Sequence, residues 1–455
     1  MIRRSIALVL GAALAGCGAL APSYQRPVAP IAPAYPDPAG LGEPASGIAW
    51  QRYFLDAGLR RLIELALVNN RDLRVAVLNI EQARAQFQLR RADQLPTVNL
   101  GFSGSRAPGA NDTIVNSYSA GLAVSSFELD MFGRVKNLSD AALAQYLATS
   151  EARKAAQISL ISSVANAYLA LLADEELLEL TRQTLTGREE SFKLIELKYE
   201  HGVLSRLELQ QGASLVDSAR VVLAQQQRQR AQDINLLTLL VGQGLPAAPG
   251  GALADSALAE LAPGLPSELL TVRPDVRAAE QALIAANANI GAARAAFFPR
   301  ITLTGSAGSA SGQLSGLFKG GSFGWTFAPQ MLLPLFDYGR NDANLDAARA
   351  AREIAVAQYE KAVQTAFREV ADALAGQATF GEQLRAQRAV AAAEAERFQL
   401  SGLRYRSGAA SYLDLLDAQR SLFAAQQAAV QANLQRLQNQ VTLYRVLGGG
   451  WLEPQ

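Results

Sequence analysis

The chain has 455 residues, with 42 lysines and arginines against 41 aspartates and glutamates, one histidine and one cysteine. The formal charge of +1 gives no overall basic field, so nucleic acid is not expected as a partner. Apolar residues make up 49% of the chain, which excludes a disordered protein. One cysteine and one histidine exclude an internal disulfide and a multi-histidine or cysteine-rich metal site. With no phosphate-binding glycine loop and no nucleophile–base pair, an enzyme is not expected.

The N-terminal residues are typical of an export signal. Two arginines precede an apolar run from Ile6 to Leu14 that is too short to span a bilayer. The run ends in Leu14-Ala15-Gly16-Cys17, which resembles the lipobox of bacterial lipoproteins. That resemblance implies removal of the signal peptide, residues 1–16, and a covalent lipid such as palmitate on Cys17. Gly18, where retained lipoproteins have aspartate, implies export to the outer membrane. The alternative is a plain signal peptide with an incidental cysteine.

Residues 17–49 contain seven prolines between Pro22 and Pro44. Proline lacks a backbone N–H and fixes φ, so this stretch predicts an extended tether without a core of its own. We expect the tether to hold the anchored cysteine at a distance from the folded body.

The remaining sequence is a tandem repeat. Asp72-Leu73-Arg74 matches Asp275-Val276-Arg277 at an offset of 203 residues. From Gly133 onward the offset is 206 without a gap. The matched pairs are Gly133 and Gly339, Tyr199 and Tyr405, Gly202 and Gly408, and Gly242 and Gly448. Repeat 1 is therefore predicted at 50–243, a linker at 244–266 and repeat 2 at 267–455.

Each repeat predicts a helix, a β-hairpin and a long helical hairpin. No proline occurs between Gly109 and Leu245, or between Leu335 and Glu453. A seven-residue apolar stripe, which favours a left-handed supercoil, supports helical hairpins at 133–241 and 339–448. The stripe in the first hairpin is Val164, Leu171, Leu178, Leu185, Phe192 and Tyr199. An ordinary dimeric coiled coil is the alternative interpretation of these helices.

The segments at about 97–130 and 300–336 alternate apolar and small polar residues, as in Val98, Leu100 and Phe102. This period of two predicts four strands, with hairpin loops at 107–116 and 312–322, of a length that suits a membrane-spanning strand. Since no apolar run after residue 20 suits a transmembrane helix, a crossing requires a closed barrel. Four strands are too few, so closure requires two copies with a plugged interior or three with an open bore. A soluble hairpin packed on a helix is the alternative.

These features together resemble the TolC-like outer membrane efflux proteins, and within them the lipoprotein branch of OprM-like (NodT-type) channels. The residues that carry the resemblance are Trp50-Gln51-Arg52-Tyr53-Phe54, the segment from Leu62 to Asp72, Phe132-Gly133-Arg134, Asp337-Tyr338-Gly339-Arg340, Tyr405-Arg406-Ser407-Gly408, the segment from Tyr412 to Arg420, and Leu447-Gly448-Gly449-Gly450-Trp451. The family implies an α+β membrane protein: a homotrimer with a twelve-stranded barrel in the outer membrane and a periplasmic α-helical barrel. It also implies a passive duct for small molecules such as drugs. The implied partners are a periplasmic adaptor and an inner-membrane pump of the resistance-nodulation-division (RND) type.

Two short turns connect the arms of the helical hairpins. They are Gly202-Val203-Leu204-Ser205 and Gly408-Ala409-Ala410-Ser411. Glycine permits the positive φ that ends one arm, and the serines are suited to cap the return helices. The resemblance implies that these turns are the periplasmic ends that dock the adaptor.

The start of the last helix carries an acidic pair, Asp414 and Asp417. Their spacing of three places both carboxylates on one helix face. If that face lines the lumen, threefold symmetry makes two stacked carboxylate rings that attract cations. The resemblance places the acidic pair at the periplasmic constriction. A solvated acidic face is the alternative.

The resemblance also assigns neighbours of this gate. Leu413 matches a hydrophobic constriction position, Tyr405 and Arg420 match residues that hold the gate shut, and Glu208 matches an acidic partner from the first hairpin. Ala410 departs from the better-known duct, which has arginine there, so the closing network must differ. A coiled-coil structural or adhesin lipoprotein and a type I protein secretion duct are the alternative functions.

Overall fold

The structure, a computed structural model, describes residues 20–35, 43–108, 114–246, 253, 258–259, 261–262 and 269–451. The predicted signal peptide and Cys17 lie outside the described residues. The chain divides into two compact units. Unit 1 comprises Met1–Ala29, Leu78–Glu151 and Arg277–Ala362, and unit 2 comprises Pro30–Val77, Ala152–Val276 and Val363–Gln455.

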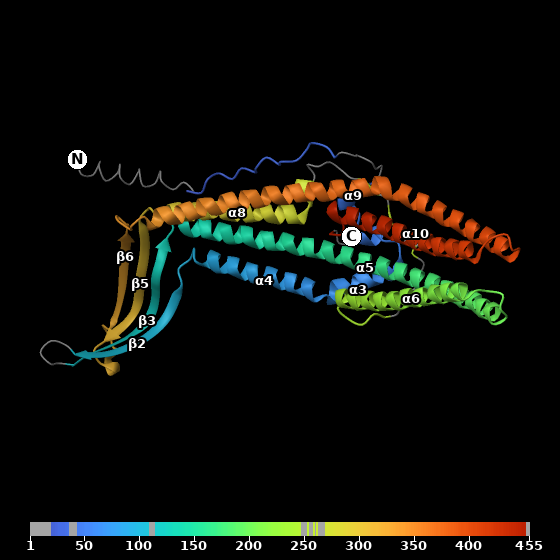
Figure 1. Ribbon diagram of the computed structural model, residues 1–455. Coiled ribbons are helices and arrows are strands. Elements are labelled where there is room, and N and C mark those ends of the chain that lie inside the picture. Colours follow the sequence, from blue (N-terminus) through green and yellow to red (C-terminus); the bar gives the residue numbers. More distant parts are fainter. Residues whose placement is uncertain are drawn as a thin grey trace. The chain divides into compact units, whose positions relative to one another are not determined.

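The two repeats have the same order of elements (Figure 1). Repeat 1 contains α4 (Arg71–Ala92), β2 (Val98–Pro108), β3 (Ile114–Leu129), α5 (Arg134–Glu200) and α6 (Arg206–Val241). Repeat 2 contains α8 (Pro274–Ala295), β5 (Arg300–Ser311), β6 (Phe323–Leu332), α9 (Arg340–Arg406) and α10 (Tyr412–Val446). The shorter elements are β1 (Glu43–Pro44), η1 (Ala45–Gly47), α2 (Trp50–Tyr53), α3 (Ala57–Asn69), β4 (Leu261–Ala262), α7 (Leu269–Val272) and η5 (Leu314–Gly316).

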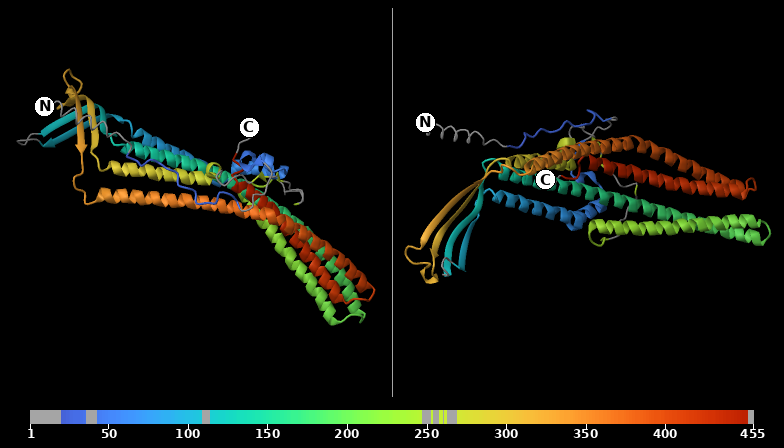
Figure 2. Two further views of the ribbon diagram at one scale, coloured as in Figure 1. Left: turned by 90° about the horizontal axis from the view of Figure 1, so that it is seen from above. Right: turned by 60° about the vertical axis from the view of Figure 1, so that its left-hand side comes forward.

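The four long strands form one antiparallel sheet of unit 1 in the order β2-β3-β5-β6. Both views in Figure 2 show these strands side by side in a curved sheet. The two hairpins meet through β3 and β5, so the central pair joins one repeat to the other. The first loop was predicted too long, at 107–116. Ala107 pairs with Val115 and Pro108 with Ile114, because the alternation of faces continues through these residues.

The register gives the sheet one apolar face and one small, polar face. Leu100, Leu122, Ala307 and Trp325 lie opposite one another across the four strands, on the apolar face. Leu100 and Trp325 are 83% and 73% exposed, so the described residues of the chain do not cover this face. The opposite face carries hydroxyl pairs, with 2.7 Å between the oxygens of Ser103 and Ser119 and 2.7 Å between those of Ser306 and Thr326. This confirms the predicted alternation.

One row of the polar face consists of glycine on every strand. The row is Gly101, Gly121, Gly308 and Gly324. A Cβ on Gly121 would lie 2.5 Å from the Ala307 carbonyl oxygen, and one on Gly308 would lie 2.3 Å from the Ala120 carbonyl oxygen. The central glycines therefore permit a close approach of the β3 and β5 backbones.

The base of the sheet is joined to the helices by a shared carboxylate. Glu128, near the end of β3, accepts hydrogen bonds of 2.8 and 2.6 Å from the Arg134 guanidinium at the start of α5. It also accepts one of 2.7 Å from Arg300 at the start of β5. Asp130 accepts from the backbone N–H groups of Val135 and Lys136 and so caps α5.

The N-terminal tether differs from the prediction, because its described start lies against α8 in unit 1. Arg26 makes a two-pronged ion pair with the buried Glu280, at 2.7 and 2.8 Å, and the Tyr24 hydroxyl donates to the same carboxylate. Asn287 and Arg294 donate to the carbonyl oxygens of Pro22 and Leu20, respectively. Polar side chains and backbone carbonyl groups thus bind this segment to the helix, although it has no core of its own.

Unit 2 contains the tips of both helical hairpins and an aromatic core. Tyr53 and Tyr444 are stacked with ring centroids 4.0 Å apart, and Phe54 packs edge-on against both rings. One window of α5 is apolar enough to cross a membrane, which the sequence analysis did not identify, but 67% of that window is buried. Burial of that extent fits a helix in the core of a bundle.

Replacing Gly121 with alanine tests the close approach of the β3 and β5 backbones. The new Cβ would overlap the backbone of β5, so Gly121→Ala should destabilise the protein by about 1–3 kcal/mol. Gly324→Ala is the matched control, because no atom lies within 4 Å of its Cβ position. Thermal unfolding in detergent measures both. Equal stability of the two variants would contradict the close approach.

Candidate functional site

The two helical tips share one local design. At the end of α5, Gly202 has φ of 71° and the N–H of Val203 donates to the Lys198 carbonyl oxygen at 2.8 Å. At the end of α9, Gly408 has φ of 75° and the N–H of Ala409 donates to the Arg404 carbonyl oxygen at 2.9 Å. Such six-to-one bonds with a left-handed glycine are the Schellman ending of a helix. The turns lie where the sequence predicted them.

Both return helices begin with a capping box. Ser205 accepts from the backbone N–H of Glu208, whose carboxylate accepts in return from the N–H of Ser205 at 2.8 Å. Ser411 and Asp414 form the same pair at the start of α10, with a return bond of 3.0 Å. The bonds from Ser411 hold the pKa of the Asp414 carboxyl below its ordinary value. Two of the predicted gate carboxylates therefore also fix the starts of their helices.

The second acidic residue of the tip, Asp417, has a partner on the other arm of its hairpin. Arg397 of α9 donates to the Asp417 carboxylate and also to Glu394, at 3.1 Å. Asp417 stays exposed, so its charge remains accessible to solvent ions. Leu413, between the two aspartates, is 54% exposed and forms an apolar point on the surface of the tip.

Tyr405 contacts the first hairpin rather than Arg420. Its ring lies 5.0 Å from the Lys198 ammonium nitrogen, and its hydroxyl accepts from that ammonium at 3.5 Å. Its ring also lies 5.6 Å from that of Tyr412. Arg420 is exposed and makes no hydrogen bond or ion pair with any residue that the structure describes. Within one chain Tyr405 therefore contacts the neighbouring hairpin, whereas no residue in the described part of the chain pairs with Arg420.

An apolar cluster joins the two hairpins just behind the tips. It contains Ile195 of α5, Leu215 of α6, and Tyr412 and Leu416 of α10, with Leu204 packed against it. The tips of the two repeats are therefore held together by buried side chains, and the polar gate residues lie at the edge of this contact.

A buried arginine reinforces the same contact. Arg188 of α5 is 4% exposed and donates to the Leu215 carbonyl oxygen at 3.0 Å. Its guanidinium lies 5.2 Å from the ring of Phe423 on α10. Burial lowers the pKa of Arg188, and the nearby Arg420 lowers it further. A movement of α10 away from α5 would break this cation–π contact.

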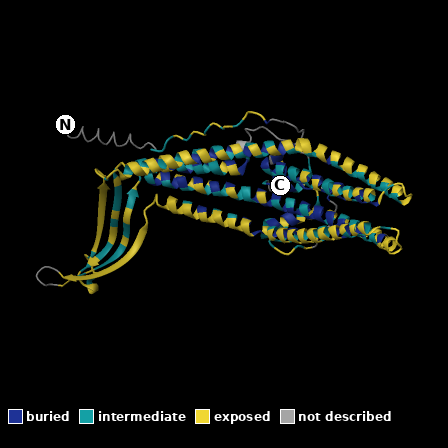
Figure 3. Cartoon of the chain, in the orientation of Figure 1, coloured by how far each residue is buried: buried dark blue, intermediate teal, exposed yellow. Residues whose placement is uncertain are grey.

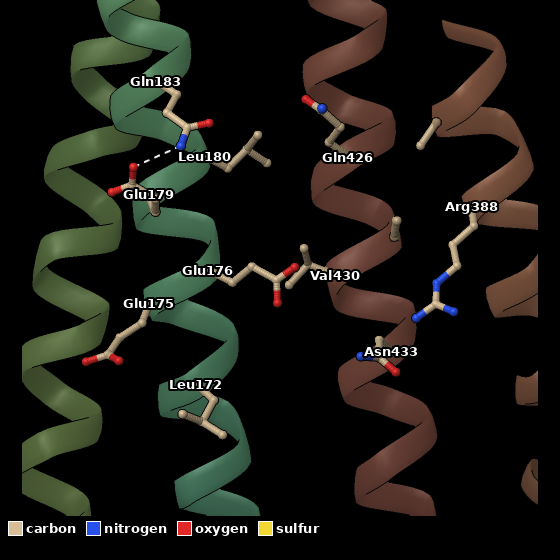
Figure 4. A pocket seen from close by; sticks show the side chains of 12 residues that line it. Leu172, Glu175, Glu176, Glu179, Leu180, Gln183, Arg388, Gln426, Val430 and Asn433 are labelled. Carbon is tan, nitrogen blue, oxygen red and sulfur yellow. Dashed lines mark hydrogen bonds between the residues drawn. The ribbon is translucent and has the colours of Figure 1, made fainter. Parts of the chain in front are cut away.

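A groove of about 610 Å³ lies between α5, α9 and α10, farther from the tips. Figure 4 shows Glu176 pointing from α5 toward Val430, and Arg388 reaching from α9 toward Asn433. Burial raises the pKa of Glu176, and the charge of Arg388 opposes this rise. Among the described residues no group of three or more histidine, cysteine, aspartate or glutamate side chains is arranged to hold a metal ion.

The first hairpin also contains a buried pair of carboxyl groups. Asp174 of α5 and Asp233 of α6 are 9% and 8% exposed, and one oxygen of Asp174 has no hydrogen-bond partner among the described residues. Burial, with the adjacent Asp233 carboxylate, raises the pKa of Asp174 to about 7. Gln229 donates to Asp233 at 3.1 Å. The two carboxyl groups therefore favour sharing a proton below neutral pH.

The sequence patterns did not indicate a role for Arg188, Lys198, Arg397 or the Asp174–Asp233 pair. A simple signal could have found several of them: residues at similar distances from a tip glycine, equal to within about three positions, face each other across a helical hairpin. Glu175 and Arg230, which are 27 and 28 positions from Gly202, follow this rule around the first tip, with 2.9 Å between their charged atoms. Contacts between the hairpins, such as Arg188 with Phe423, have no such signal in the sequence.

The chain is similar to known proteins along nearly its whole length. The family model of the outer membrane efflux protein matches residues 62–243 and again 265–449. The antibiotic efflux pump outer membrane protein ArpC of Pseudomonas putida is 46% identical over 100% of this chain and 97% of its own length. The toluene efflux pump outer membrane protein TtgC, also of Pseudomonas putida, matches to the same extent. The open state of the MtrE outer membrane channel of Neisseria gonorrhoeae has a TM-score of 0.88 and 41% identity, covering 95% of this chain and 98% of MtrE.

The buried carboxyl pair predicts a pH-dependent stability. A raised pKa in the folded state means that stability is greatest below the unfolded pKa of about 4 and falls as pH rises toward 7. Asp174→Asn should remove most of this slope, because the amide does not ionise and donates to Asp233. Melting temperatures between pH 4 and pH 7 measure it, with the exposed Asp217→Asn as control. An unchanged slope in Asp174→Asn would contradict the shared proton.

Proposed function

The chain belongs to the outer membrane efflux protein family, and from that premise we propose that three copies form a passive duct from the periplasm to the cell exterior. As a member of this family the protein is an outer-membrane efflux channel protein, with an α+β fold and four long strands in each chain. The proposed trimer places twelve strands in one barrel and continues it with the helical hairpins.

One observation carries the proposal: the sheet has one uncovered apolar face, and its edge strands β2 and β6 each have one side that no other strand in the described part of the chain pairs with. An open edge does not exist in lipid, because its N–H and C=O groups would be unsatisfied. Closure by identical copies removes both edges and turns the apolar face to the lipid. The same sheet counts against a coiled-coil spacer or adhesin, which would have no use for it. We also propose that the protein acts without catalysis and without a cofactor other than its lipid.

We propose that the tips dock a periplasmic adaptor and, through it, an RND-type pump in the inner membrane. The docking residues are Gly202, Val203, Leu204, Ser205, Gly408, Ala409, Ala410 and Ser411. Val203 is 69% exposed, whereas Leu204 packs inward on the cluster between the hairpins. Rigid turns with small or exposed apolar side chains suit docking with little loss of conformational entropy.

The proposed cargo is a range of small organic molecules. Two relatives at 46% identity are named for antibiotic efflux and for toluene efflux. Above Glu128 and Arg300, the polar face of the described strands carries only Gly, Ala, Ser, Thr, Asn, Gln, Val and Leu. A wall without charge fits compounds of different charge and shape.

Acylation of Cys17 remains part of the proposal. The Leu20 carbonyl, three residues later, is bound by Arg294 in the last turn of α8, and β5 begins five residues after α8 ends. That position supports a lipid close to the base of the sheet, where the membrane would begin. We likewise propose the repeat boundaries at 50–243 and 267–455, which agree in order with the two matches of the family model.

For the gate, we propose that Asp414 and Asp417 line the periplasmic constriction with Leu413. Both carboxylates are exposed, and Asp414 ionises easily because Ser411 binds its charged form. Tyr405, Arg420 and Glu208 are proposed to hold the closed state. Since Arg420 has no partner among the described residues, its partner in this proposal is an acidic group of a neighbouring copy.

Planar-bilayer recording and a deletion strain test the proposed function. The purified protein should form trimers that conduct, and deleting its gene should raise susceptibility to aromatic solvents or antibiotics at least several-fold. Restoring the gene should restore resistance. A stable monomer that does not conduct would contradict the duct.

Removing the acidic pair tests the gate. Asp414→Ala with Asp417→Ala should weaken block by divalent cations, because two carboxylates per copy leave the constriction. The control is Asp346→Asn, an exposed carboxyl on the part of α9 in unit 1. If cation block is the same in the double variant and the wild type, these residues do not line the path. Tyr405→Phe or Arg420→Ala should raise the conductance of the closed state.

A further inference from the structure

The edge strands β2 and β6 define how one copy would meet the next. Every described side chain on β2 and β6 is exposed, whereas β3 and β5 are partly covered (Figure 3). The inference below rests on the proposed trimer, in which β6 of one copy pairs with β2 of its neighbour. What the trimer alone does not give is the register of that pairing.

The two faces of the sheet restrict the register first. On β2 the apolar face carries the even-numbered residues Leu100 and Phe102, and on β6 it carries the odd-numbered residues Trp325 and Phe327. Residues directly opposite each other point to the same face, so an even number must pair with an odd one. Within one copy Trp325 lies in the same row as Leu100. We call the number of residues from Leu100 to the β2 residue of the next copy that lies opposite Trp325 the displacement per copy. Because both residues are on the apolar face, this displacement is an even number.

Closure of the barrel further restricts the displacement per copy. Strands of a closed barrel are tilted, so a row of opposed residues returns displaced along the strand after one full circuit. With twelve strands about 4.8 Å apart and 3.4 Å per residue, displacements of two, four, six and eight per copy give tilts of about 20°, 35°, 47° and 55°. Tilts of about 35–45° are typical of such barrels; displacements of four and six fall at or within about 2° of this range, whereas two and eight lie about 10° or more outside it.

The strand ends decide between four and six. A displacement of six sets Phe323 opposite Pro108 and Leu332 opposite Asn99, so all ten residues of β6 are paired. A displacement of four sets Phe323 opposite Arg106 and leaves Ala107, Pro108 and Leu332 without partners in the neighbouring copy. In lipid each unpaired N–H or C=O costs several kcal/mol, which favours the longer ladder.

We propose that β6 pairs with β2 of the neighbouring copy with Thr326 directly opposite Ser105. In this register Trp325 lies opposite Arg106 on the apolar face, where the guanidinium can contact the indole ring. On the polar face the hydroxyl of Ser105 extends the pair formed by Ser306 and Thr326. The glycine row rises by six residues from each copy to the next and forms a spiral, not a closed ring.

Disulfide cross-linking in the full-length protein tests this register. Directly opposed residues have Cα atoms about 4.5–5.5 Å apart, within the 4.4–6.8 Å that a disulfide spans, whereas positions displaced by two lie about 7–8 Å apart. Ser105→Cys with Thr326→Cys should give covalent trimers on a non-reducing gel after mild oxidation. Ser103→Cys with Thr326→Cys, the pair for a displacement of four, should give at least several-fold less.

Matched controls separate the possible results. Ser306→Cys with Thr326→Cys joins directly paired residues of one chain and should cross-link within the monomer. Either single variant, Ser105→Cys or Thr326→Cys, should give no covalent trimer. Ala107→Cys with Gly324→Cys is a second pair with the same displacement of six, should the first pair fail to assemble.

The register is overturned if Ser103→Cys with Thr326→Cys cross-links more strongly than Ser105→Cys with Thr326→Cys in protein that conducts in bilayers. The proposed duct function would be unaffected by that result. Cross-linking of the intrachain control without any covalent trimer from the 105–326 or 107–324 pair would also overturn the register. If that protein neither forms trimers nor conducts, the proposed function fails with it.

Discussion

The constraint on which the structure depends is the hydrogen-bonding demand of two strand edges. β2 and β6 each present a row of backbone groups that no other described strand of their own chain pairs with. Water can satisfy such groups, but lipid cannot, so an isolated copy could not lie stably in a bilayer. Assembly and membrane insertion must therefore be coupled.

The two repeats share the structure of their tips but differ in one buried polar pair. Both tips use a left-handed glycine followed by a capping box. The buried carboxyl pair Asp174–Asp233 belongs to the first repeat only, because the offset of 206 places Phe380 and Asn439 at the matching positions. Asn439 donates instead to the Ala373 carbonyl oxygen at 2.9 Å. Acidification would therefore affect the first hairpin more than the second.

Sequence alone predicted the larger features because each follows from a local rule. The two long hairpins follow from proline-free heptads, and the turns follow from glycine and serine at the tips. The strand faces follow from alternation.

Contacts between distant elements were not predictable in this way. The ion pair of Arg26 with Glu280 joins residues more than 250 positions apart, and the tether was accordingly expected to stand free of the body. The gate shows the same limit. Arg397, which binds Asp417, could have been located by its distance from the tip glycine. The contact of Arg188 with Phe423 could not, because Phe423 lies on the helical hairpin of the other repeat.

The row of bare glycines has a consequence for what the barrel can recognise. At this row the wall has no side chains, so it offers a passing solute no side-chain hydrogen-bonding group, no charge and no side-chain surface to pack against. Hydroxyl groups beside the row are already bonded to one another, which leaves them little capacity to hold a guest. The exit of this protein is therefore suited to release, and any discrimination among molecules has to take place before they reach it.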